Sequence, residues 1–261
     1  MLKATKGRIG RGLFRVSGVN PIHIIGCARS GTTYMQYCML AYEQTVVENA
    51  ETAPDFPGLI GKVRLAAESA ALGGMTYVTK RTYGWFKQTQ IQSLLDAVDR
   101  YDLGIILMLR DPRNVMKSVH HGNADGKPYV PGTPYVDEQR WYESILAGET
   151  IWSELGHYPR KCIVKYEDLI GDPDLVDRSI RKAFSLQTRP GVTNINQAKT
   201  NASRIQYKVA RGQEMAMNGL RNADPSALSK PRGTVDVESP TIRSKAQEVI
   251  DTYWPSAPTE L

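Results

Sequence analysis

The stretch IHIIGCARSGTTYMQ, Ile22–Gln36, constrains the fold of this chain more than any other. An apolar run leads to Gly26, four residues separate it from Gly31, and two threonines follow. This spacing is typical of a phosphate-binding loop between a strand and a helix, where backbone amides converge on one anion. In the nucleoside-triphosphate version a lysine follows the second glycine, whereas here that position is Thr32 and the nearest cation is Arg29. The loop therefore predicts an anion site that differs from that of a triphosphate-binding enzyme.

Short apolar runs bounded by turn residues or charges predict a parallel sheet. The runs with the length of buried strands are Ile22–Ile25, Thr76–Thr79, Gly104–Leu109 and Cys162–Lys165. Helical spacing lies between them, at Thr32–Ala41, Lys62–Leu72, Gln90–Arg100 and Arg140–Leu155. This alternation predicts an α/β fold, a P-loop-type doubly wound sheet with mainly parallel central strands flanked by helices. Such sheets bind ligands at the C-terminal ends of their strands.

The length of 261 residues is enough for one large α/β domain with a buried core. Residues 1–20 are basic and have no apolar segment, so we expect a flexible N-terminal arm followed by a single domain over residues 21–261. Two stretches interrupt the strand–helix alternation. Gly122–Pro134 is predicted to be a loop long enough to cover a site, and Arg189–Pro240 is predicted to form helices and loops at the sheet edge.

Charge and cysteine usage narrow the class of protein. A net charge of +6 suits either a solvated surface or a site for a polyanion. The basic residues are scattered without interleaved aromatic residues, so we expect no nucleic-acid partner. The three cysteines form no metal or redox motif and suggest a reducing compartment. No signal peptide or transmembrane segment is recognisable, so we expect a cytoplasmic protein, and the sequence carries no prediction of its oligomeric state.

A second anion motif follows the third predicted strand, in LRDPRNVMKSVHHG. Arg110 ends the strand, while Asp111 and Pro112 have the residue types of a helix N-cap and a first helical position. We expect Ser118 two helical turns beyond Arg110, so that these two side chains form a phosphate site apart from the loop. Two alternatives stay open. Arg110 could pair with Asp111 or another carboxylate, and Asp111 could bind magnesium as in NTPases.

Together with CIVKYEDLIGDP at the end of the fourth strand, these motifs resemble the PAPS-dependent sulfotransferases over roughly Ile22–Pro173. The resemblance implies transfer of a sulfuryl group from 3′-phosphoadenosine 5′-phosphosulfate (PAPS) to an acceptor hydroxyl of a small molecule, sugar, lipid or peptide. PAP would be the product, and no metal would be needed. The residues that the resemblance assigns to the donor are Arg29, Ser30, Gly31, Thr32 and Thr33 for the phosphosulfate, Arg110 and Ser118 for the 3′-phosphate, and Tyr166.

Within that family the layout is most similar to the tyrosylprotein sulfotransferases, which share the RSGTT loop. Their glutamate–threonine pair is matched by Glu51-Thr52 with a one-residue slip, and their lysine on the next strand by Lys80. The resemblance implies that Glu51 is the general base, and that Arg29 and Lys80 stabilise charge during transfer. Lys230 and Arg232 match a late basic segment that related enzymes place over the 3′-phosphate. Asp-Pro-Arg replaces the Asp-Gly-Arg of these enzymes, and their membrane anchor and secretory disulfides are not recognisable.

Other assignments compete with this one. Glu48 or His120 could serve as the base in place of Glu51, while His23 is predicted to be a core histidine. A P-loop small-molecule kinase is the alternative enzyme, although the missing lysine at Thr32 opposes it. A relative that binds PAP or another nucleotide without transferring a group is the non-catalytic alternative.

Overall fold

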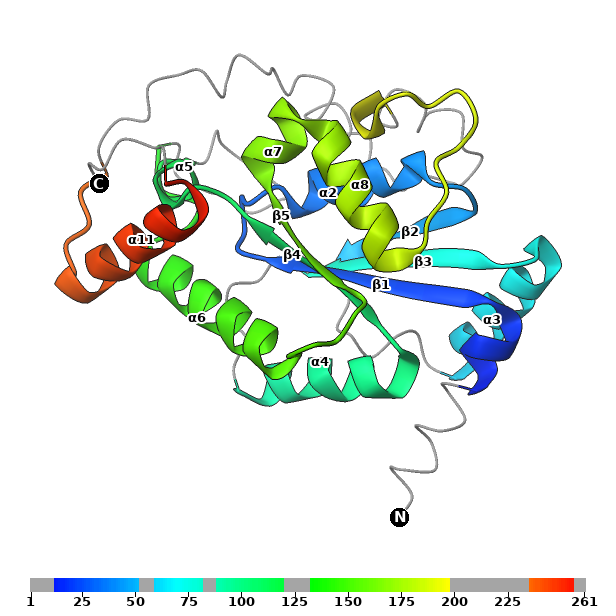
Figure 1. Ribbon diagram of the computed structural model, residues 1–261. Coiled ribbons are helices and arrows are strands. Elements are labelled where there is room, and N and C mark those ends of the chain that lie inside the picture. Colours follow the sequence, from blue (N-terminus) through cyan, green and yellow to red (C-terminus); the bar gives the residue numbers. More distant parts are fainter. Residues whose placement is uncertain (1–11, 52–58, 82–87, 120–131, 198–234, 256–261) are drawn as a thin grey trace.

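The computed structural model describes residues 12–51, 59–81, 88–119, 132–197 and 235–255 (Figure 1). Its centre is a five-stranded, wholly parallel sheet in the order β2-β3-β1-β4-β5. The strands are β1 Val19–Gly26, β2 Thr45–Glu51, β3 Met75–Arg81, β4 Gly104–Leu109 and β5 Lys161–Lys165. The chain proceeds from β1 towards one edge and then returns to the other side of β1 for β4. The predicted α/β, doubly wound parallel sheet is therefore confirmed, and its switch point lies beside β1.

Helices cover both faces of the sheet, so the central strands are buried on both sides. In addition to a short helical segment at residues 12–17, the described helices are α2 Thr32–Cys38, α3 Leu59–Leu72, α4 Gln88–Tyr101, α5 Pro112–Met116, α6 Glu138–Glu154, α7 Tyr166–Gly171, α8 Pro173–Phe184 and α11 Pro240–Tyr253. Along β4, Leu107 points into the core beneath α4, α6 and α11, whereas Met108 points into the core beneath α2 and α8. Figure 1 shows α4 and α6 on one side of the sheet and α2 and α8 on the other. This double burial explains the nearly continuous apolar runs of the central strands.

All four predicted strands are present, but β2 was not predicted. It forms the edge of the described sheet, pairs with β3 alone, and changes register between Val47 and Glu51. Its sequence, TVVENAE, has only two strongly apolar residues, Val46 and Val47, and both are partly exposed. The pattern that identifies buried strands is therefore weak here, although β2 carries the predicted base Glu51 at its end.

The N-terminal boundary also differs from the expected one. Residues 12–17 are helical, and Phe14 is buried in the core against the Tyr101 ring. Ordered structure thus begins before residue 20, while residues 1–11 lie outside the described residues. Within the described part of the chain, no helix combines the length and apolarity needed to cross a membrane.

Candidate anion-binding site

The turn between β1 and α2 needs glycine at both of its ends. Gly26 has φ +152°, and a Cβ on it would lie 2.6 Å from the Met108 carbonyl oxygen. Gly31 has φ +90°, and a Cβ on it would lie 3.0 Å from Cε2 of Tyr166 and closer still to Cδ2. Two neighbouring elements, β4 and α7, therefore press directly on the loop backbone. This is the close approach that the G-x-x-x-x-G spacing predicts.

Inside the loop, Ser30 and Arg29 have different roles. The Ser30 hydroxyl donates to the Cys27 carbonyl at 2.6 Å, and its amide donates to the same oxygen at 3.1 Å. Ser30 therefore closes the turn, and its side chain is buried. Arg29 takes φ +69°, a left-handed conformation that costs a non-glycine residue about 1–2 kcal/mol, and its side chain is exposed. Strain of this kind concentrates at functional sites.

Arg29 connects the loop to the second motif. Its Nε donates to the Ser118 hydroxyl oxygen at 2.7 Å, and its guanidinium lies 4.9 Å from the centroid of the Tyr135 ring. The expectation that Ser118 lies on the helix after Arg110 is wrong, because α5 ends at Met116 and Ser118 follows it. The two predicted phosphate motifs are therefore adjacent rather than apart. Tyr135 was missed by the sequence reasoning, since nothing local marks it.

Arg110 lies against the same loop. Its NH1 donates to the Arg29 carbonyl oxygen at 2.9 Å, and its guanidinium stacks 4.6 Å from the centroid of the Tyr166 ring. Burial lowers the pKa of Arg110, and the charge of Arg29 lowers it further. Its buried Nε has no hydrogen-bond partner among the described residues. Within that part of the chain, neither Arg110 nor Arg29 forms an ion pair with a carboxylate.

Asp111 does not pair with Arg110 but with Arg113. As predicted, Asp111 caps α5, its Oδ1 accepting from the Arg113 amide at 2.9 Å. The same oxygen accepts from Arg113 Nε at 3.0 Å, and Oδ2 accepts from NH2 at 2.8 Å. Both side chains are at most 1% exposed. The Asp111 amide donates to Glu167 Oε1 at 3.3 Å, so this buried pair connects β4 to α7.

The predicted catalytic pair lies at the ends of neighbouring strands. Glu51 is the register partner of Lys80 across β2 and β3, and Lys80 is in turn the partner of Ile24 on β1. The Lys80 side chain is buried, with 6% of its surface exposed. Glu48, the competing base, accepts a hydrogen bond from the Tyr77 hydroxyl at 2.7 Å. That bond gives Glu48 a structural role in holding β3 against β2.

The remaining predicted site residues differ in burial, and some of them lie outside the described residues. Thr32 is buried at the first position of α2, while Thr33 is partly exposed. Lys230, Arg232 and His120 lie outside the described residues. His23 is a core residue, as predicted: its Nδ1 lies 2.7 Å from the Thr79 hydroxyl oxygen, and burial lowers its pKa to about 3.

Comparison with known proteins identifies the fold. Neither a protein-family model nor a curated sequence matches the chain. The sulfotransferase domain from the Synechococcus PCC 7002 olefin synthase is 16% identical with a TM-score of 0.59, and the match covers 91% of this chain and 95% of that domain. The sulfotransferase domain from the curacin biosynthetic pathway is 15% identical with a TM-score of 0.58, over 89% and 96% of the two chains. The chain therefore has the fold of sulfotransferase domains, and the finer likeness to tyrosylprotein sulfotransferases stays a prediction.

Proposed function

We propose that this chain is a sulfotransferase that moves a sulfuryl group from PAPS to an acceptor hydroxyl. The observation that carries the proposal is the contact of two arginines, in which the Arg110 guanidinium donates to the Arg29 carbonyl and neither side chain has an ion-paired carboxylate among the described residues. The exposed charge of Arg29 repels the partly buried charge of Arg110, and a bound anion would relieve both this repulsion and the desolvation of Arg110. The likeness of the fold to sulfotransferase domains supports the same chemistry.

The proposed donor has two anionic groups, and the adjacent motifs offer a place for each. The phosphosulfate would lie on the loop, at the backbone of Gly31 and the amides and hydroxyls of Thr32 and Thr33. Ser30 would act by closing the turn. The 3′-phosphate would lie at Arg110 and Ser118, because the Arg110 Nε is unpartnered among the described residues and the Ser118 hydroxyl retains its proton for donation.

Three further residues complete the proposed donor site. Tyr166 stacks on Arg110 and would border the nucleoside. Lys230 and Arg232 would approach the 3′-phosphate, as the resemblance implies. These assignments are tested by the same donor titrations as Arg110.

The transfer itself would be one in-line step. The acceptor oxygen forms a bond to sulfur while the bond from sulfur to the bridging phosphate oxygen breaks, so that PAP leaves with the electron pair. The acceptor proton passes to Glu51, whose backbone is the register partner of Lys80. Arg29 and Lys80 stabilise the negative charge that develops on the departing phosphate.

The alternative of a magnesium-dependent kinase is opposed by the ion pair at the end of β4. Both Asp111 oxygens accept hydrogen bonds from Arg113, and the carboxylate is fully buried. To coordinate magnesium, Asp111 would have to break its buried ion pair with Arg113, and breaking such a pair costs about 3–5 kcal/mol. Thr32, where kinases of this type carry a lysine, is also buried.

The deciding experiment compares PAP with AMP, which differs only in lacking the 3′-phosphate. Charge-assisted hydrogen bonds contribute about 1.5–3 kcal/mol each, so losing two should weaken binding at least about a hundredfold in calorimetry. Arg110→Ala should remove most of this preference while changing AMP affinity little. Arg64→Ala is the matched control, because Arg64 is an exposed arginine on α3 paired with Glu68. Equal affinities for PAP and AMP, or a preference for ATP with magnesium, would contradict the proposal.

A turnover assay separates the non-catalytic alternative. Release of PAP from PAPS in the presence of mixed alcohol acceptors is expected to proceed in EDTA, because no step requires a metal. Tight PAP binding without any acceptor-dependent release would favour a relative that binds the nucleotide but does not transfer the sulfuryl group.

A further inference from the structure

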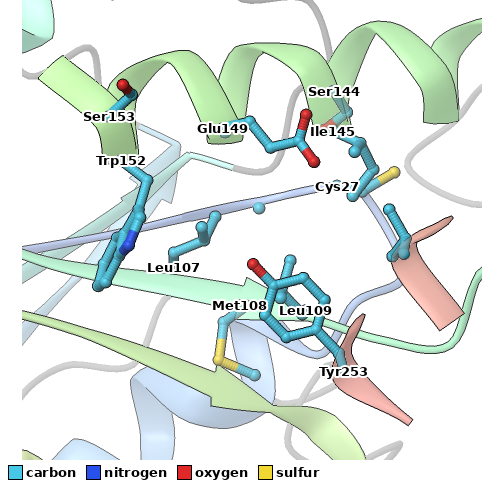
Figure 2. A pocket seen from close by; sticks show the side chains of 13 residues that line it. Cys27, Leu107, Met108, Leu109, Ser144, Ile145, Glu149, Trp152, Ser153 and Tyr253 are labelled. Atoms are coloured by element: carbon cyan, nitrogen blue, oxygen red, sulfur yellow. The ribbon is translucent and has the colours of Figure 1, made fainter. Parts of the chain in front are cut away.

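A separate cavity of about 380 Å³ lies between β4 and the helices α6 and α11 (Figure 2). Leu107 and Leu109 of β4 line it from the sheet, and its inner end reaches Gly26 and Cys27, where β1 enters the loop. None of the residues proposed to hold PAPS lines it. The cavity is thus on the α6 face of the sheet, whereas α2 and α7 cover the other face.

The shape of the cavity follows from residues on the two helices. Trp152 of α6 and Tyr253 of α11 place aromatic rings along it, as Figure 2 shows. Gly148 leaves the middle of α6 without a side chain, and a Cβ there would lie 3.3 Å from Leu107 Cδ1. The absence of that Cβ keeps the space above β4 open. The volume lies in the range of about 300–1,000 Å³ that is usual for small-molecule sites.

The polar groups of the cavity favour a neutral ligand. At the mouth, the Glu149 carboxylate is already paired with Lys245, at 2.8 Å. Deeper inside, the buried Ser144 hydroxyl lies beside the Cys27 thiol but has no hydrogen bond of regular geometry among the described residues. Burial raises the pKa of Cys27 to about 12, so this neighbour is uncharged. A buried hydroxyl that meets a thiol without regular hydrogen-bond geometry is poorly satisfied, and a ligand hydroxyl would satisfy it better.

We propose that this cavity binds a small uncharged molecule with a flat apolar body and one hydroxyl group. The body would lie between Trp152, Tyr253 and the β4 leucines, and the hydroxyl would bond to Ser144. Aromatic side chains prefer flat partners in offset or edge-on contact, which selects a ring over a flexible chain. The site is distinct from the proposed donor site, so it extends the proposed function rather than depending on it.

The test measures the binding of two isosteric probes, 2-phenylethanol and propylbenzene, by ligand-observed NMR titration. Both should bind the wild-type protein saturably. Ser144→Ala should weaken 2-phenylethanol about two- to tenfold, the range of one hydrogen bond, and leave propylbenzene unchanged or slightly tighter. If the two probes respond equally to Ser144→Ala, the assignment of the hydroxyl to Ser144 is wrong.

Cavity-filling variants test the location. Val249→Phe and Ile145→Phe enlarge two lining side chains and should weaken both probes at least about tenfold by steric exclusion. Leu146→Phe is the matched control, because Leu146 is exposed on α6 and is not a lining residue. Melting temperatures show which variants are folded. Absence of saturable binding to the wild type, or unchanged binding in a folded filling variant, would overturn the proposal. Such a failure would leave PAP binding, and with it the proposed transfer, unaffected.

Discussion

The packing of Tyr166 on the loop between β1 and α2 predicts that Gly31→Ala strongly lowers the free energy of unfolding. Two costs add at this position. An alanine at φ +90° takes a left-handed conformation, which costs about 1–2 kcal/mol. Its Cβ also meets the Tyr166 ring at 3.0 Å from Cε2 and closer to Cδ2, and overpacking of this kind costs about 1–3 kcal/mol. We therefore expect Gly31→Ala to lower the free energy of unfolding by about 2–5 kcal/mol.

Two further variants separate these costs. Gly73 has φ +72° but nothing within 4 Å of an added Cβ, so Gly73→Ala measures the backbone term alone and should cost about 1–2 kcal/mol. Removing the ring in Tyr166→Ala should eliminate the steric term, so that Gly31→Ala in that background costs no more than Gly73→Ala. Urea unfolding followed by circular dichroism gives each value, provided that the slope m is unchanged.

The coupling energy from this cycle is the decisive quantity. Contacting residues show interaction energies of about 0.5–3 kcal/mol, whereas independent sites add within about 0.5 kcal/mol. A coupling below that limit would refute the contact between Tyr166 and the loop. Such a result would also remove one of the two links between the loop and Arg110, because the same ring stacks on that guanidinium. The hydrogen bond from Arg110 to the Arg29 carbonyl is the other link.

Four other predictions test the fold and the site. Because His23 has a folded pKa of about 3 against about 6.5 when unfolded, stability should fall as the pH drops below 6.5, by about 2 kcal/mol at pH 5, and His23→Leu should abolish this slope in urea titrations. Asp111→Ala should cost about 3–5 kcal/mol by removing the carboxylate that pairs with the buried Arg113, and exchanging both residues for apolar ones should recover much of that loss in the same assay. Glu51→Gln should lower turnover at least about a hundredfold without changing the calorimetric affinity for PAP, and a turnover near that of the wild type would transfer the role of base to another group. Gly148→Ala should raise the melting temperature, with a gain in unfolding free energy of up to about 1 kcal/mol, because helix propensity improves and the Leu107 methyl group that it meets can move into the cavity.

Local patterns predicted the parts of this protein that depend on local chemistry. The loop between β1 and α2 was predictable because two glycines at this spacing are typical of a phosphate-binding turn. The start of α5 was predictable because Asp111 and Pro112 are the residue types that favour a helix N-cap and the first helical position. The strand β2 was not predictable, since an edge strand lacks the double-sided burial that produces a continuous apolar run. The helix after Arg110 was predicted too long, because its sequence does not show that α5 ends at Met116.

Contacts between distant segments could not be predicted. Arg29 and Ser118 are 89 residues apart, and only the parallel pairing of β1 with β4 brings their motifs together. The choice of Arg113 rather than Arg110 as the partner of Asp111 also depends on geometry, because the cap already orients that carboxylate towards the first turn of α5. The sequence left open whether Asp111 pairs with Arg110. In the structure Asp111 pairs with Arg113, so Arg110 forms no ion pair with Asp111.

The position of the cation explains why a loop of this kind can do without its usual lysine. Thr32 begins α2 and is 2% exposed, at the position where nucleoside-triphosphate loops carry a lysine that reaches the β/γ-phosphates. Arg29 instead leaves the turn at φ +69° and reaches across to Ser118, beside the end of β4. The positive charge of the loop is thereby joined to a second cation, Arg110, which donates to the Arg29 carbonyl. Such a loop suits a ligand with two separate anionic groups better than a linear triphosphate, and this geometric difference is the physical reason for proposing PAPS rather than a nucleoside triphosphate as the donor.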